Sequence, residues 1–189
     1  MFLPRKVLEE KLRNMLAEDI GEGDITTALI IPVGVTGEAE VRFKEPGIVA
    51  GIEESIVLLE SLGLKTQALF RDGEEVEADH IIMKISGDAR TILSVERTLL
   101  NLLSRMSGIA TATKRLVEKI QKAKLKTRIA CTRKTAPGLL YFDKKAVLLG
   151  GGDTHRLHLD DMICQSAVFG AVEKFQIVGE QEVVFEFAR

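Results

Sequence analysis

Apolar and polar residues along the front half of the chain follow the periods of helices and short strands. After Pro4, leucines recur at helical spacing, which predicts an opening helix that ends near Gly21. Apolar residues alternate with charged ones over 38–43, which predicts a half-buried strand. The same patterns predict three further elements, with a turn at Asp72-Gly73 between the last two: a helix over 53–62 and strands over 66–70 and 81–85.

The longest helical region, 91–122, precedes a back half in which the pattern of apolar and polar residues is different. Its apolar residues are dense enough to bury more than one face, and Ser107-Gly108 predicts a break into two helices. Strands then alternate with helices and glycine-rich loops, which is typical of βα units around a parallel sheet. We therefore predict an α+β domain over 1–112 and a βα domain over 113–189. The predicted back-half elements are a strand over 125–132, a helix after the Pro-Gly loop, a short apolar step at 162–163, a helix over 167–175 and a strand over 183–187.

Composition is that of a folded globular protein and excludes several partners. The chain has 189 residues, 46% of them hydrophobic, with 26 basic and 28 acidic side chains and a net charge of -2. A balanced charge and 5% aromatic residues give no basis for binding nucleic acid. The chain has no apolar run long enough to span a membrane and no apolar signal core at its N-terminus. Its two cysteines lack the spacing of metal ligands, so we expect a soluble, cytoplasmic protein.

The candidate chemistry lies between residues 131 and 156. Arg133-Lys134 follows a predicted strand, and His155-Arg156 follows the glycine triplet 150–152. Loops at the carboxyl ends of parallel strands collect functional residues, and glycines let a backbone approach a ligand closely. Clustered cations are most stable when a multiply charged anion lies between them. Spacing alone leaves open whether these pairs form an anion pocket or solvated surface.

Two other charged positions bear on this interpretation. Arg97 lies inside an apolar helical stretch, where a charge is expected to need a partner. Lys144, in the predicted helix between the two cationic pairs, is expected to be a solvated helix charge.

Several blocks of the chain resemble the quinolinate phosphoribosyltransferase family. The resemblance covers about residues 17–163 and is carried, in order, by AEDIGEGDITT, SVERTLLNLLSRMSGIATAT, TRKTAPGL and KKAVLLGGGDTHRLHLDD. It implies an α+β N-terminal domain followed by the first part of an open α/β barrel, incomplete here, in a homodimer with sites between subunits. It also implies a pentosyltransferase that joins quinolinate to phosphoribosyl pyrophosphate with Mg²⁺, releasing carbon dioxide and pyrophosphate and giving nicotinate mononucleotide in NAD biosynthesis.

The resemblance also assigns roles to individual residues. Arg97, Arg133, Lys134, His155 and Arg156 match family positions that hold quinolinate, with the Arg97 position reaching in from the neighbouring subunit. Lys134 is the catalytic candidate among them. Together these cations would clamp the two carboxylates and favour the charge that develops on the ring as carbon dioxide leaves.

The match departs from the family pattern after residue 163. Ser166 stands where the family has a lysine, and the tail resembles a family strand with an acidic metal ligand, which makes Glu186 a candidate for Mg²⁺. A complete β/α barrel takes about 250 residues, so we expect a shortened chain. Two alternatives to the transferase stay open: a paralogue associated with molybdate transport, and a non-catalytic truncated remnant that dimerises or binds anions.

Overall fold

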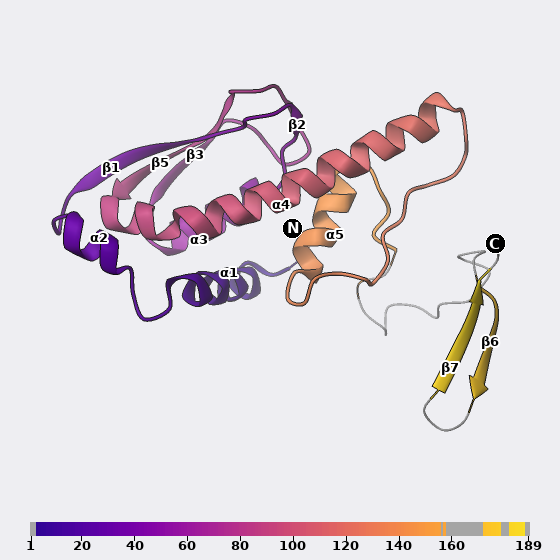
Figure 1. The fold of residues 1–189 in the computed structure, drawn as a ribbon. Helices are drawn as coiled ribbons and strands as arrows, with labels where there is room; N and C mark the ends of the chain where they lie inside the picture. Colours follow the sequence, from indigo (N-terminus) through magenta and orange to yellow (C-terminus); the bar gives the residue numbers. More distant parts are fainter. Residues whose placement is uncertain (1–2, 156, 158–171, 179–181, 188–189) are drawn as a thin grey trace. The chain divides into compact units, whose positions relative to one another are not determined.

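The computed structural model describes residues 3–155, 157, 172–178 and 182–187 (Figure 1). The chain forms two compact units, which divide between His155 and Arg156. No helix among the described residues is long and apolar enough to cross a bilayer.

The first unit begins with the opening helix that the sequence predicts and continues with alternating helices and strands. Its elements are α1 (Arg5–Ile20), α2 (Ile25–Ile30), β1 (Thr36–Arg42), β2 (Gly47–Ile48), α3 (Ile52–Ser61), β3 (Lys65–Ala68), β4 (Glu75–Val76), β5 (Ile81–Asp88), α4 (Ala89–Lys122) and α5 (Leu140–Leu149). The predicted front-half helices and strands are all present within a few residues of their expected bounds. This part of the chain is α+β, as predicted.

An antiparallel sheet in the order β1-β5-β3 forms one layer of the first unit, and α4 runs alongside it (Figure 1). Ile85 on β5 pairs with Ala39 on β1 and with Thr66 on β3, which fixes the register of all three strands. The two predicted strands around Asp72-Gly73 do pair, but their connection is longer than a tight hairpin. It contains β4, which pairs with β2 in a separate small sheet.

The core lies between α1, α3, α4 and the inner face of the sheet. Each helix contributes an apolar stripe at the spacing of one helical face, as Leu8, Leu12 and Leu16 do on α1. Burying one leucine of this kind contributes roughly 1.5–3 kcal/mol relative to leaving it in water. The stripes therefore explain why these helices pack together.

Helix α4 is one continuous helix of 34 residues, so the predicted break at Ser107-Gly108 is wrong. The Ser107 hydroxyl donates to the Ala50 carbonyl and accepts from the Ala50 amide, at 3.1 Å each. Because these tertiary bonds satisfy the serine, it does not compete for the helix backbone. The predicted domain boundary at residue 112 falls within this helix and stays a prediction.

The back half departs further from the prediction. The expected strand over 125–132 is reduced to an isolated parallel bridge between Ala130 and Asp153, whereas the expected helix after it is present as α5. The step at 162–163 and most of the helix over 167–175 lie outside the described residues. Residues 172–175 belong instead to a strand, β6 (Val172–Val178), so the helix prediction is wrong there. Polar and apolar residues alternate over 174–177, which is a strand period.

Strand β7 (Glu182–Phe187) confirms the predicted final strand. It pairs with β6 in an antiparallel hairpin, with Phe175 opposite Phe185. The second unit therefore contains a hairpin where the sequence predicted βα alternation.

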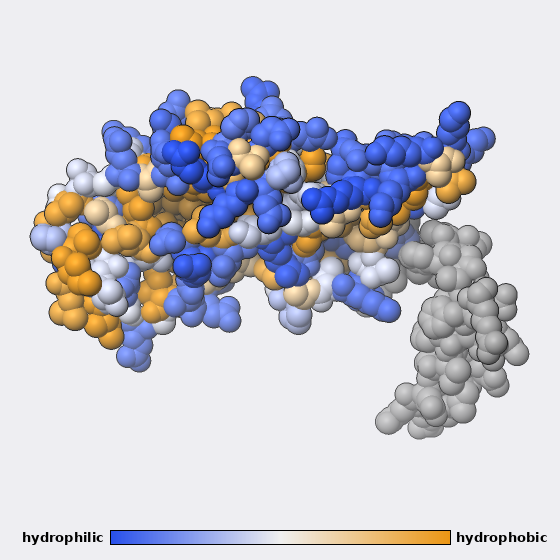
Figure 2. Space-filling view, turned by 45° about the horizontal axis from the view of Figure 1, so that its top comes forward, coloured by the Kyte–Doolittle hydropathy of each residue, from blue (hydrophilic) through white to orange (hydrophobic). Residues whose placement is uncertain are grey.

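An apolar patch is exposed on the first unit, on α2 and the segment that follows it. Figure 2 shows it as an orange area at the end of the unit that α2 occupies in Figure 1. Its large side chains, all more exposed than buried, are Ile25, Leu29, Ile30 and Val33.

Candidate anion site

The parallel bridge between Ala130 and Asp153 brings together the two segments that lead into the cationic residues. The Cys131 amide donates to the Asp153 carbonyl at 3.0 Å, and the Asp153 amide donates to the Ile129 carbonyl at 2.8 Å. Because the paired segments run in the same direction, the residues that follow each of them leave from the same end. Arg133-Lys134 and His155 are the residues that follow.

Arg133 and Lys134 both carry exposed side chains on a loop held by its own backbone. The Lys134 amide donates to the Thr132 hydroxyl at 3.1 Å, and the Thr135 amide donates to the Arg133 carbonyl at 3.0 Å. Among the described residues, neither side chain forms an ion pair. The two cations are therefore accessible to an anion from solvent.

His155 is held by a tight turn around Asp153. Its φ of 56° lies in the left-handed region, which is uncommon for a residue other than glycine. Its amide donates to Oδ1 of Asp153 at 2.8 Å, while Oδ2 of Asp153 pairs with Arg128 at 3.1 Å. The aspartate thus stabilises the backbone conformation that presents His155. Arg156 lies outside the described residues.

The glycine triplet mainly allows close packing within the protein, and its predicted approach to a ligand stays untested. A Cβ atom on Gly150 would lie 2.4 Å from the Ala110 carbonyl oxygen, and one on Gly152 would lie 2.7 Å from Val147. Gly151 has a φ of 84°, a conformation that glycine adopts without strain. The triplet therefore lets the loop turn tightly against α4 and α5.

Three consecutive charged residues on α5 are buried, although their sequence pattern did not indicate it. Asp143, Lys144 and Lys145 are 7%, 1% and 5% exposed. The prediction that Lys144 is a solvated charge is wrong, because its ammonium donates to the Thr154 carbonyl at 2.6 Å. Asp143 accepts two bonds from Arg105 on α4, at 2.7 and 2.9 Å. No local signal separates such residues from a solvated helix face.

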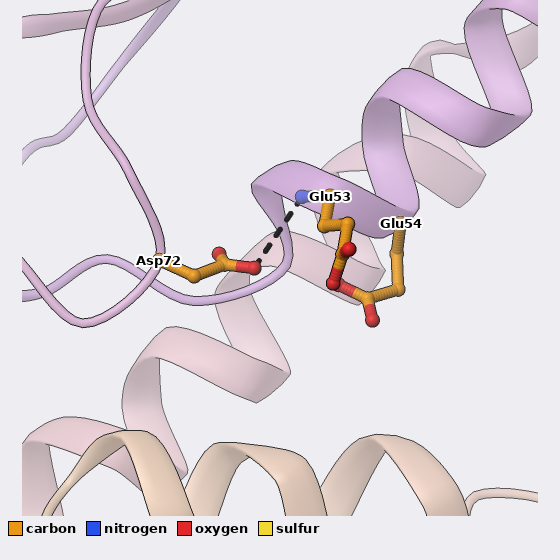
Figure 3. Close-up of side chains that lie close together, drawn as sticks. All are labelled: Glu53, Glu54 and Asp72. Atoms are coloured by element: carbon orange, nitrogen blue, oxygen red, sulfur yellow. Dashed lines mark hydrogen bonds between the residues drawn. The ribbon is translucent and has the colours of Figure 1, made fainter. Parts of the chain in front are cut away.

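Lys145 lies among three carboxylates that belong to the front of the first unit. Glu53 and Glu54 project from the start of α3, and Asp72 reaches the same place from a loop (Figure 3). The Lys145 ammonium lies 2.6 Å from Glu53, 2.7 Å from Glu54 and 3.0 Å from Asp72. Burial alone would lower its pKa, but the charges of Glu54 and Asp72 outweigh burial and raise it.

Tyr141 and Asp72 complete this carboxylate cluster. The Tyr141 hydroxyl donates to Glu54 at 2.9 Å, and burial together with the Glu54 charge raises the tyrosine pKa. Asp72 also accepts from the Gly51 and Ile52 amides at 2.8 Å each, which caps the N-terminus of α3.

The cluster does not support a metal site. Oxygen atoms of Glu53, Glu54 and Asp72 lie within 4.8 Å of one another, as the ligands of a cation could. The Lys145 ammonium already lies within hydrogen-bond distance of all three carboxylates and offsets part of their negative charge. Glu186 is on β7, where side chains are not described, so its metal role stays a prediction.

Arg97 lies on α4 with 68% of its side chain exposed. The expectation that it needs a partner because it is buried is therefore wrong. Within the described part of the chain, Arg97 pairs with the adjacent Glu96, at 3.9 Å. One helical turn earlier, the Ser94 hydroxyl donates to Asp24 at 2.9 Å, and Asp24 caps α2. Arg97 is thus on the side of α4 that faces the α2 segment, and the described residues do not join it to the cationic loops.

Two solved structures share the fold of this chain. A NadC crystal structure from Streptococcus pyogenes is 30% identical, with a TM-score of 0.80, and the match covers 90% of this chain and 62% of that one. The nicotinate-nucleotide pyrophosphorylase of Francisella tularensis is 35% identical, with a TM-score of 0.76, and the match covers 84% and 56%. The fold is that of a nicotinate-nucleotide pyrophosphorylase.

Sequence comparisons identify the family. Residues 24–107 match the quinolinate phosphoribosyl transferase N-terminal domain, and residues 109–178 match its C-terminal domain. The chain therefore belongs to the quinolinate phosphoribosyl transferase family. A probable nicotinate-nucleotide pyrophosphorylase (carboxylating) from Methanocaldococcus jannaschii is 49% identical over 152 residues, which are 80% of this chain and 53% of that protein. The chain spans about half the length of the curated relatives it matches.

Proposed function

We propose that the chain takes part in the enzymatic transfer of a phosphoribosyl group from phosphoribosyl pyrophosphate to quinolinate. The transfer joins the ring nitrogen to the sugar, releases pyrophosphate and carbon dioxide, and gives nicotinate mononucleotide in NAD biosynthesis. The observation that supports the proposal most is the Ala130–Asp153 bridge, because Arg133, Lys134 and His155 follow the two paired segments. Membership of the family supports the same activity, that of a pentosyltransferase.

The cations at this edge suit a pyridine dicarboxylate. Arg133 offers a planar fork that can bind one carboxylate through two bonds, while Lys134 and His155 offer single donors. Arg156, the next residue along, is proposed to complete the set. As carbon dioxide leaves, its bonding electron pair stays on the ring, and we assign Lys134 to stabilise that charge before a proton replaces the lost group.

The βα region is proposed as the first part of an open α/β barrel. The parallel bridge supports this, because it joins the segment before α5 to the segment after it, as in a βα unit. Mg²⁺ is proposed as the cofactor from the family resemblance alone. We expect Mg²⁺ to bind together with phosphoribosyl pyrophosphate, through its phosphate oxygens.

A homodimer is proposed through the apolar patch on α2. Its four side chains, Ile25, Leu29, Ile30 and Val33, suit burial against a second copy. Arg97 is exposed on the neighbouring side of α4, so it would lie beside the interface with a second copy bound at the patch. Sedimentation velocity at micromolar concentration tests the proposal. Leu29→Ser should favour the monomer, whereas Leu116→Ser, an exposed leucine elsewhere on α4, should not.

Calorimetry with phthalate, an unreactive analogue of quinolinate, tests the anion site. A hydrogen bond to a charged group contributes roughly 1.5–3 kcal/mol. Arg133→Ala should therefore weaken binding by about tenfold to a hundredfold. Arg115→Ala removes an exposed arginine from α4 and should leave the affinity unchanged. Equal affinities of the two variants would show that Arg133 is not part of a pocket.

Turnover of quinolinate with phosphoribosyl pyrophosphate and Mg²⁺ tests the reaction itself. Formation of nicotinate mononucleotide, lost in Lys134→Ala, supports the transferase. Phthalate binding without turnover would instead favour an anion-binding remnant or the molybdate-associated paralogue.

A further inference from the structure

Lys144 makes a contact that links α5 to the segment carrying His155. Its side chain is 1% exposed, and its ammonium donates to the Thr154 carbonyl at 2.6 Å. Thr154 immediately precedes His155, so this bond acts on the peptide unit that joins the two residues. Burying an ammonium is costly unless it forms hydrogen bonds, which makes the bond a strong constraint on the loop.

The same carbonyl also contacts the other cationic segment. The Cys131 thiol lies 3.6 Å from the Thr154 oxygen, and Cys131 comes two residues before Arg133. The Thr154 carbonyl therefore joins α5, the Arg133 segment and the His155 segment at one point. A rotation of this peptide unit would break both contacts and change the direction of His155.

The helix that carries Lys144 is itself fixed on both sides. Asp143 binds Arg105 of α4 through two bonds, and Lys145 binds the carboxylates of α3 and its neighbouring loop. The helical turn that carries Lys144 is thus attached to its neighbours by two other sets of contacts, which do not involve the Thr154 carbonyl.

We propose that Lys144 is a positioning residue that sets the orientation of His155 through the Thr154 carbonyl. It contacts no substrate in this role, and its effect on the anion site is indirect. The link to quinolinate binding rests on the proposed function, whereas the effect on the loop does not. Two measurements on the same variants keep these parts separate.

The first measurement is amide hydrogen exchange, which needs no ligand. Lys144→Met keeps the apolar stem and removes the donor, so exchange at the His155 amide should become about tenfold faster or more. Amides in the middle of α4 should be unaffected under conditions where the variant stays folded. Lys144→Arg keeps a donor at this position and should restore most of the protection. Lys144→Leu, which also lacks a donor, replaces the methionine variant if that one does not fold.

The second measurement is phthalate affinity by calorimetry, with Asp143→Asn as the matched control. Asp143→Asn weakens the attachment of α5 to α4 but leaves the Lys144–Thr154 bond in place. Lys144→Met should lower the affinity about tenfold, with recovery in Lys144→Arg, while Asp143→Asn should lower it less than threefold.

Each result has a distinct meaning. Unchanged exchange at His155 in Lys144→Met overturns the positioning role. Equal losses of affinity in Lys144→Met and Asp143→Asn also overturn it, because they would reflect general loosening of α5. If the unmodified chain does not bind phthalate, the proposed function fails, and the exchange data still decide whether Lys144 holds the loop.

Discussion

Replacing Lys145 with methionine should destabilise the first unit strongly. The change keeps most of the apolar stem but leaves three carboxylates together, of which Glu54 has a side chain 0% exposed. Removing one partner of a buried ion pair typically costs about 3–5 kcal/mol, because the other charge stays uncompensated. For a chain of this size each kcal/mol lowers Tm by about 2–4 °C, so a fall of about 6–20 °C is expected.

Urea unfolding followed by circular dichroism measures this loss. The matched control is Lys114→Met on α4, whose lysine is 40% exposed and lies 3.7 Å from Glu75. Such an exposed pair should cost under about 1 kcal/mol. Adding Glu54→Gln to Lys145→Met should recover part of the stability, because it removes one buried charge. A loss below about 1 kcal/mol in Lys145→Met would refute the view that its ammonium stabilises the carboxylate cluster.

Further substitutions and changes of pH test the packing of the glycine loop and the contribution of the titrating groups to stability. Gly150→Ala should destabilise the first unit by about 1–3 kcal/mol in urea unfolding, because its methyl group would meet a carbonyl oxygen of α4 at 2.4 Å. Gly108→Ala on α4 has open space around it and should stabilise the unit by roughly 0.5–1 kcal/mol. Lys145 and Tyr141 have raised pKa values, so the stability they contribute is present below their unfolded values of 10.5 and 10.0 and should be lost as the pH rises above them, visible as a falling Tm. Asp88 has a lowered pKa through its bonds to Thr91, so its contribution is present above pH 3.8 and should be lost on acidification, less steeply in Asp88→Asn.

The front half could be predicted because its signals are local. Pro4 precedes the first helix, Gly63 with a φ of 80° follows α3, and Asp88 caps α4. Each of these residues acts on its immediate neighbours, so the sequence around it is enough. The false break at Ser107 shows the limit, because the hydroxyl bonds to Ala50, which is distant in sequence.

The back half was harder to predict, because its structure depends on pairing between residues that are distant in sequence. The segment around Ala130 forms only a bridge, and its partner Asp153 follows a loop, α5 and the glycine triplet. The position of Arg133 directly after a strand-like segment was nevertheless predictable, whereas the pairing of that segment with Asp153, just before His155, had no strand signal in the sequence. The burial of Lys144 was not predictable either, because a lysine in a helix has the same local pattern whether it is solvated or bound to a carbonyl.

Helix α5 shows why the three buried charges were missed and what they do together. Consecutive helical residues project about 100° apart, so Asp143, Lys144 and Lys145 point in three directions. They reach α4, the His155 loop and the carboxylates at the start of α3. Read as a pattern, three adjacent charges indicate a polar face, but here each charge meets a different partner. The bond to the His155 loop and the bonds to α3 therefore leave from adjacent residues of one helical turn.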